Sequence, residues 1–143
     1  MARYVTEIES ALPQAEALAY MADFANARLW DPSVSEARAV GEAPIGIGSA
    51  FELVARFGGR NVRLRYEIVE YDAPRRVVLE AQRAGFVSRD MITVEPEEKG
   101  SVVRYDATLA FGGVGRLFDP VMQRIFNRVG ARATLGMQTA LNP

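Results

Sequence analysis

The sequence predicts an α+β fold in which a curved antiparallel sheet of about seven strands wraps around one long C-terminal helix, with two short helices after the first strand. Apolar residues recur at helical spacing over 116–141, and Gly, Pro and Asp turn signals separate alternating segments through most of the chain. A short helical pattern near the start is broken at 30–32. Because a single helix across a curved sheet leaves room between the two, we expect a ligand cavity there.

The first elements follow from local pattern. Residues 3–10 alternate between apolar and polar side chains, which predicts a strand. Pro13 stands where a helix can begin without losing a needed backbone donor. Apolar residues then recur at helical spacing up to Ala25, and Pro32 disfavours helix at the residue before it. Two short helices with a kink fit this stretch better than one long helix.

The middle of the chain reads as strands joined by short turns. Gly58-Gly59 is a hairpin signal, since both glycines accept the positive φ that a primed turn needs. Short connections make sequential strands antiparallel neighbours. With no repeat, linker or low-complexity stretch, residues 1–143 are expected to form a single domain. The expected strands are 3–10, 34–42, 49–57, 61–71, 76–83, 86–95 and 101–111.

The closing helix carries one broad apolar face, from Leu117 to Leu141, with arginines mainly opposite. Gly130 and Gly136 lie inside it, although each glycine costs about 1 kcal/mol relative to alanine in a helix interior. They indicate either a close approach to the sheet or a gap in the packing. Joining this helix face to the apolar faces of the strands gives an interior lined by Phe, Tyr, Leu, Met and Val.

Strand 86–95 does not show which face is buried. One face carries Asp90 and the other carries Arg89, so either orientation takes a charge inward, where it needs a partner or a ligand. Arg104 and Asp106 on the next strand could pair with them across the ladder. Two interpretations stay open: a surface network of salt bridges, or a polar spot inside an apolar cavity.

Composition narrows the chemistry. The chain has no cysteine and no histidine, which excludes Ser-His-Asp and Cys-His nucleophilic sites and almost every zinc site. Acid–base work could fall only to carboxylates, tyrosines, Lys99 or bound water. We expect no metal and no cofactor. A net charge of -1 gives no reason to expect nucleic acid or an anionic membrane as a partner.

The sequence also bears on location. The N-terminal residues carry no apolar signal core, and nowhere do about 18 apolar residues run together. A cytoplasmic protein without stable membrane insertion is therefore expected. An exposed strand edge would allow a homodimer, but nothing in the sequence requires one, so a monomer or a homodimer is expected.

Three motifs carry a resemblance to a known family. They are 22–26 leading to Trp30-Asp31-Pro32, Gly46-Ile47-Gly48-Ser49-Ala50-Phe51 opening a strand, and 67–76, all followed by the closing helix. Over essentially its full length the chain resembles the polyketide cyclase/dehydrase group of the START-like (SRPBCC) superfamily. The resemblance implies the helix-grip fold and a cavity between sheet and C-terminal helix that takes a bulky apolar molecule.

The resemblance and the apolar faces together give candidate site residues. Trp30 matches a family tryptophan often found near the cavity mouth; the alternative is that it anchors its turn by hydrophobic packing. The expected ligand-binding residues are Trp30, Phe51, Leu53, Tyr66, Ile68, Met91, Tyr105, Phe118, Met122, Phe126 and Val129. The weak catalytic candidates are Arg89, Asp90, Arg104, Tyr66 and Tyr105.

The leading functional hypothesis is binding of a hydrophobic small molecule, lipid, polyketide or aromatic-like, in a carrier or sensor role. The alternative is a polyketide cyclase or dehydratase type of enzyme, which would position such a ligand and use mild acid–base catalysis. A third reading is an interaction module that docks a partner protein through the sheet or the helix.

Overall fold

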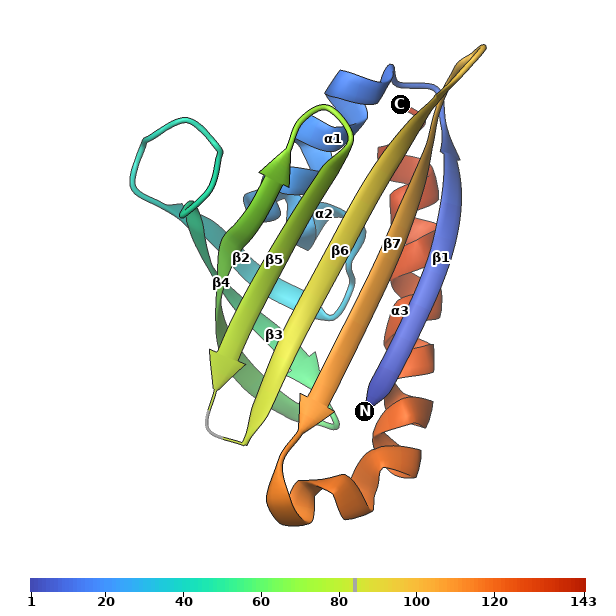
Figure 1. The fold of residues 1–143 in the computed structure, drawn as a ribbon. Coiled ribbons are helices and arrows are strands. Elements are labelled where there is room, and N and C mark those ends of the chain that lie inside the picture. The colour runs from blue at the N-terminus through green and yellow to red at the C-terminus, as the bar shows by residue number, and fades with distance from the viewer. Residues whose placement is uncertain (84) are drawn as a thin grey trace.

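The computed structural model describes residues 1–83 and 85–143, except for the side chains of Val114, Arg116 and Phe118. One seven-stranded antiparallel sheet has the strand order β1-β7-β6-β5-β4-β3-β2 and curls around the long helix α3 (Figure 1). This is the expected helix-grip arrangement. The elements are β1 Ala2–Ser10, α1 Gln14–Ala22, η1 Phe24–Asn26, α2 Ala27–Trp30, β2 Val34–Val40, β3 Ala50–Phe57, β4 Arg60–Asp72, β5 Arg76–Arg83, β6 Phe86–Glu97, β7 Gly100–Phe111, η2 Gly113–Phe118 and α3 Asp119–Ala140.

The strand boundaries confirm the sequence pattern to within a few residues. Gly58 and Gly59 have φ of 60° and 82°, so the β3–β4 hairpin turns where both glycines are needed. Register shifts between Val34 and Glu36, and between Ile68 and Glu70, mark irregularities that help to curve the sheet. The closing helix starts later than expected, because 113–118 form a separate 3-10 turn before Asp119.

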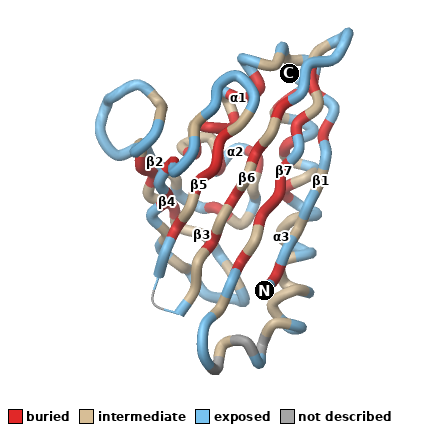
Figure 2. Tube along the Cα trace, viewed as in Figure 1, coloured by how far each residue is buried: buried red, intermediate tan, exposed pale blue. Residues whose placement is uncertain are grey.

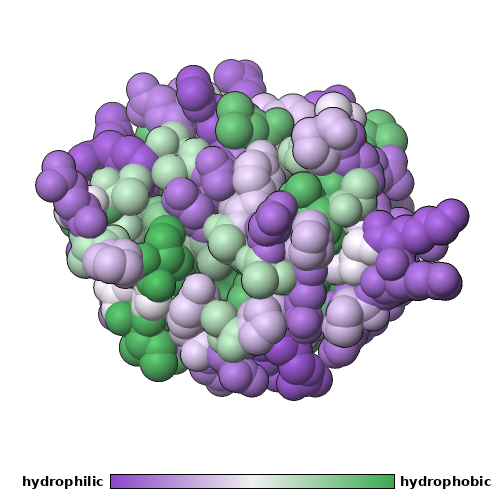
Figure 3. Space-filling view, turned by 90° about the horizontal axis from the view of Figure 1, so that it is seen from above, coloured by the Kyte–Doolittle hydropathy of each residue, from purple (hydrophilic) through white to green (hydrophobic). Residues whose placement is uncertain are grey.

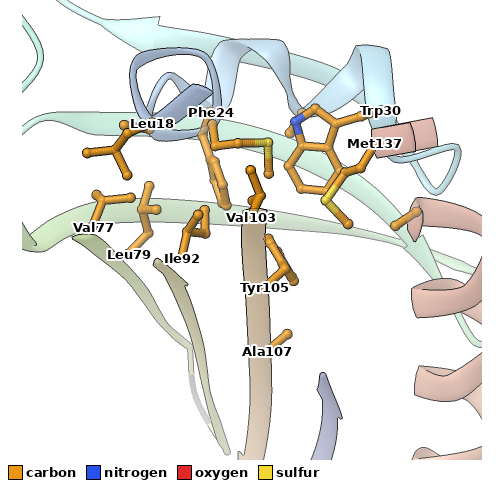
Figure 4. Close-up of a cluster of buried hydrophobic side chains, with 14 of the residues drawn as sticks. Leu18, Phe24, Trp30, Val77, Leu79, Ile92, Val103, Tyr105, Ala107 and Met137 are labelled. Atoms are coloured by element: carbon orange, nitrogen blue, oxygen red, sulfur yellow. The ribbon is translucent and has the colours of Figure 1, made fainter. Parts of the chain in front are cut away.

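The core divides into a filled half and an open half. Helix α1 lies over β5, β6 and β7, where Leu18 and Phe24 face Val77, Leu79 and Ile92 (Figure 4). Buried residues follow the inner face of these central strands and alternate with more exposed ones (Figure 2). Helix α3 instead follows β1 (Figure 1). The interior between α3 and the hairpin β3–β4 is therefore left with few backbone elements to fill it.

Both glycines of α3 mark close approaches. A Cβ built on Gly130 would overlap the ring of Tyr4 on β1, so this glycine lets the helix approach the sheet. A Cβ on Gly136 would overlap the backbone carbonyl of Trp30, so the second contact is with α2 rather than with the sheet. The expected close approach to the sheet is therefore found at Gly130, whereas Gly136 packs closely against α2 instead, and neither glycine is explained by a gap in the packing.

Two side-chain amides, one in the first turns of α3 and one just past its C-terminal end, bond to the backbone of β1 and of the residue that follows it. Gln123 accepts from the Arg3 N–H at 2.9 Å and donates to the Arg3 carbonyl at 2.8 Å. Asn142 accepts from the Ala11 N–H at 2.8 Å and donates to the Glu9 carbonyl at 2.9 Å. These bonds satisfy backbone groups at an edge strand and fix α3 along it.

Among the described residues, no helix combines the length and the apolar character needed to cross a membrane. Seen end-on, the surface shows apolar side chains in small groups separated by hydrophilic ones (Figure 3).

Candidate ligand cavity and its buried polar cluster

A cavity of about 200 Å³ lies between the inner face of the sheet and α3. For comparison, an apolar protein cavity of roughly 150 Å³ is large enough to bind benzene. Half-buried apolar side chains surround its outer end, and two buried tyrosines and the buried carboxyl of Asp90 lie deeper. The outer residues are Phe57, Phe86, Phe111, Met122 and Phe126.

Most of the expected ligand-binding residues line this cavity. Strands contribute three of them, the end of α2 contributes one and α3 contributes three. The residues that the structure brings together are Trp30, Leu53, Tyr66, Tyr105, Met122, Phe126 and Val129. Phe118 falls on a side chain outside the described part of the chain.

Three of the expected ligand-binding residues lie elsewhere. Phe51 and Ile68 are buried in the hydrophobic core, where the Phe51 ring packs 6.4 Å from that of Phe24. Met91 lies on the opposite face of β6 because its neighbour Asp90 faces the cavity. These three residues therefore lie in the core or on the outer face of the sheet and not at the cavity.

The orientation of β6 settles which charges are inside. Ser88, Asp90, Ile92 and Val94 are buried, so the Asp90 face is the inner one. Arg89, on the outer face, pairs with Glu80 at 3.2 Å. Both interpretations are therefore correct, each for one face of β6. The outer face carries salt bridges, and the inner face carries a polar spot in the cavity.

The catalytic candidates divide in the same way. Asp90, Tyr66 and Tyr105 line the cavity, whereas Arg89 and Arg104 do not, because both lie on the outer face of the sheet. Arg104 pairs with Glu7 on β1 at 3.5 Å. The expected pairing of Asp106 with β6 is also wrong, because Asp106 forms a 2.7 Å ion pair with Arg3 on the other neighbouring strand.

Two hydrogen-bonded pairs form the polar cluster. The Tyr105 hydroxyl donates to Oδ2 of Asp90 at 2.7 Å, between diagonal neighbours on adjacent strands. The Tyr66 hydroxyl and the Ser88 hydroxyl lie 2.8 Å apart. Tyr66 and Ser88 belong to β4 and β6, and the strand between them places Ala81 in the same row. A small residue there leaves the path across β5 open for the tyrosine side chain.

Burial governs the electrostatics of the cluster. The pKa of Asp90 is raised to about 7, chiefly by desolvation; the hydrogen bond from Tyr105 opposes the rise, and the charges of Asp31 and Asp106 add to it. Burial also holds the pKa values of Tyr66 and Tyr105 well above the usual tyrosine value, so both keep their protons near neutrality. Asp90 is thus the group of this cluster that changes charge close to neutral pH.

Asp31 is a site residue that the sequence pattern indicated only as a helix stop. It lines the cavity, and its Oδ1 accepts from the backbone N–H and the hydroxyl of Ser33 at 2.9 and 2.7 Å. Burial raises the pKa of this carboxyl as well. Ser88 was also missed, although the alternation of β6 places it on the same face as Asp90.

Trp30 joins the cavity wall to the packing of both short helices and α3. Its ring packs edge-on against Tyr105 at 5.5 Å and against Phe24 at 6.0 Å. The close-up shows it beside Met137 and above Tyr105 (Figure 4). Its indole Nε1 is buried without a hydrogen-bond partner in the described part of the chain. The tryptophan therefore serves both as an anchor of its turn and as cavity wall.

Comparison with known proteins gives the family. Residues 1–141 match the model of the family described as polyketide cyclase / dehydrase and lipid transport. No curated protein sequence matches the chain significantly.

Solved structures share the fold at low sequence identity. A START superfamily protein from Mycobacterium smegmatis has a TM-score of 0.80 at 10% identity, over 99% of this chain and 97% of that one. A protein from Thermus thermophilus has a TM-score of 0.75 at 19% identity, over 98% and 95%. Ginseng major latex-like protein 151 from Panax ginseng has 0.71 at 10%, over 99% and 98%. With the family model covering nearly every residue, the chain belongs to the polyketide cyclase / dehydrase and lipid transport family.

Proposed function

We propose that this protein binds a hydrophobic small molecule in the cavity under α3, as a carrier or sensor, and that it does so in the cytoplasm. The observation that carries the proposal is an interior space of about 200 Å³ whose wall is mostly apolar and whose deep end holds a carboxyl and hydroxyl groups. Small-molecule sites combine these features, since apolar surface supplies affinity and a few polar groups fix orientation. The lipid-transport part of the family description supports the same reading.

Calorimetric titration with naphthalene, a neutral bicyclic probe, tests whether the cavity accepts a ligand. Ala107 on β7 lines the cavity, so Ala107→Leu fills part of it and should weaken binding by about tenfold or more. Ala110→Leu is the matched control, because Ala110 is exposed near the same end of β7. Equal binding by the wild type and Ala107→Leu, or no binding by either, would contradict the proposal. Native mass spectrometry of the purified protein would then identify a co-purified ligand.

A cyclase or dehydratase activity is the second candidate. It is favoured by Asp90, whose pKa of about 7 and contact with Tyr105 suit a proton acceptor working near neutrality. The test is turnover of a poly-β-keto substrate by the wild type and by Asp90→Asn. Loss of turnover with naphthalene binding retained would support the enzyme, and equal turnover by both proteins would exclude this role for Asp90.

A further inference from the structure

The deep end of the cavity offers hydrogen-bond acceptors in excess of donors. Tyr105 already donates to Oδ2 of Asp90, and both donors from Ser33 go to Oδ1 of Asp31. Within the described residues, no donor is bonded to the second oxygen of either carboxyl. A ligand group that donates a hydrogen bond would therefore find an unused acceptor.

The Tyr66–Ser88 pair adds a single donor, and the other donor without a partner in the described lining, the indole N–H of Trp30, is itself fully buried. Each hydroxyl has one hydrogen, and the 2.8 Å bond between them uses one of the two. Ser88 and Asp90 lie on the same face of β6, two residues or about 7 Å apart. A ligand hydroxyl between them could donate to the carboxyl and accept from the hydroxyl pair, which a carboxylate could not do.

The charged groups around the cavity also favour a neutral ligand. Asp31 and Asp90 both line the cavity, and the charge of each acts on the deep polar groups. Among the described residues that line it, none is an arginine or a lysine. An anionic ligand group would therefore enter a poorly solvated space beside two carboxyls without a counter-ion, which is costly.

We propose that the cavity selects neutral, largely apolar molecules that enter with a hydroxyl group leading, and that it discriminates against molecules that lead with a carboxylate or another anion. This inference rests on the proposed binding function and specifies its ligand class. In this assignment Asp90 accepts a hydrogen bond from the ligand hydroxyl, and the Tyr66–Ser88 pair donates one to it.

Three probes that share one ring system test it: naphthalene, 2-naphthol and 2-naphthoate. Titrations at about pH 8 keep 2-naphthol neutral, 2-naphthoate charged and Asp90 ionised. The wild type should bind 2-naphthol about tenfold more tightly than naphthalene, and 2-naphthoate about tenfold less tightly than naphthalene. In Asp90→Asn the difference between 2-naphthol and 2-naphthoate should shrink by about tenfold, while naphthalene binds as before.

Asp106→Asn is the matched control, because Asp106 is equally buried but faces Arg3 on the outside of the sheet. It should leave the preference of the wild type unchanged. Wild-type protein that binds 2-naphthoate as tightly as 2-naphthol overturns the inference but leaves the binding function standing, provided naphthalene binds. If none of the three probes binds, the binding function itself fails. The comparison of the three probes on the wild-type protein tests the inference even if Asp90→Asn does not fold.

Discussion

Tyr105 and Asp90 meet at the deep end of the cavity, where the phenol donates a 2.7 Å hydrogen bond to a carboxyl that is only 5% exposed. The bond links β7 to β6 on the inner face of the sheet. A carboxyl in such a place is expensive to ionise, and a single neutral donor compensates only part of that cost. Whether the Asp90 carboxyl holds its proton should therefore affect both what the cavity binds and how stable the fold is.

Asp90 should make the protein less stable as the pH rises. The folded state holds the Asp90 proton up to about pH 7, whereas an unfolded carboxyl releases it near pH 3.9. Between these values the folded state binds more protons, so raising the pH favours unfolding. Asp90→Asn keeps the shape and removes the titration.

Urea unfolding at about pH 4 and about pH 8 measures this effect. The free energy of unfolding of the wild type should fall relative to Asp90→Asn by on the order of 3 kcal/mol across that range. Asp31 shifts in the same direction but is present in both proteins, so its effect largely cancels. Parallel pH dependence in the two proteins would show that Asp90 ionises in the fold at its ordinary pKa.

Removing the Tyr105 hydroxyl should expose the cost of the buried charge. Tyr105→Phe leaves Asp90 without its donor, which we expect to cost about 1–3 kcal/mol of unfolding free energy, and more at about pH 8 than at about pH 5. Tyr4→Phe is the control, because the Tyr4 hydroxyl lies 3.1 Å from the uncharged hydroxyl of Thr134. A loss for Tyr105→Phe that does not change with pH would contradict the role of the charge.

Asp106 should show the opposite dependence on pH. The hydrogen bond and charge of Arg3 lower the pKa of Asp106, so the folded state favours the ionised carboxyl. Its stabilisation is present above the unfolded pKa near 3.9 and is lost as the pH falls through the lower folded value. Compared with Asp106→Asn, the wild type should lose stability below about pH 4 in a urea titration. If the stability advantage of the wild type over Asp106→Asn grew as the pH fell, this assignment would be refuted.

Alanine at Gly136 should destabilise the fold, although alanine in a helix is normally about 1 kcal/mol better than glycine. The added Cβ would overlap the Trp30 carbonyl, which is backbone and cannot rotate away. At Gly130 the obstacle is the Tyr4 side chain, so Gly130→Ala should cost less. Thermal unfolding of both variants ranks the two contacts. A rise in melting temperature for Gly136→Ala would mean that α3 does not pack closely against α2 at this point.

Local sequence pattern was sufficient for the elements but not for the whole cavity. The Gly58-Gly59 hairpin and the break at Pro32 depend on backbone preferences of those residues, so both could be read directly. The boundary between filled core and cavity depends on tertiary packing. Phe51 and Leu53 share a strand face, yet the Phe51 ring packs against that of Phe24 and only Leu53 lines the cavity, and the periodicity of β3 does not show where the Phe24 ring lies.

The polar residues of the site show the same limit. On β6 each face carries a charge, so alternation alone could not choose between Arg89 and Asp90. Two partners absent from the local pattern decide it: Tyr105 from β7 reaches Asp90 inside, and Glu80 from β5 reaches Arg89 outside. Asp31 follows a helix and precedes a proline, and only the curl of the sheet brings it to the cavity wall.

The backbone hydrogen bonds of Gln123 and Asn142 hold one wall of the cavity together, whereas the opposite wall is a hairpin. Gln123 near one end of the helix and Asn142 just past the other bind the β1 backbone and the residue that follows it, so helix and edge strand form one stiff side. The facing side is the two-glycine β3–β4 hairpin, whose Gly58 lies across from the Ile125 side chain of α3. Because those hydrogen bonds tie α3 to β1, we expect a wide ligand to make room by displacing the β3–β4 hairpin rather than the helix.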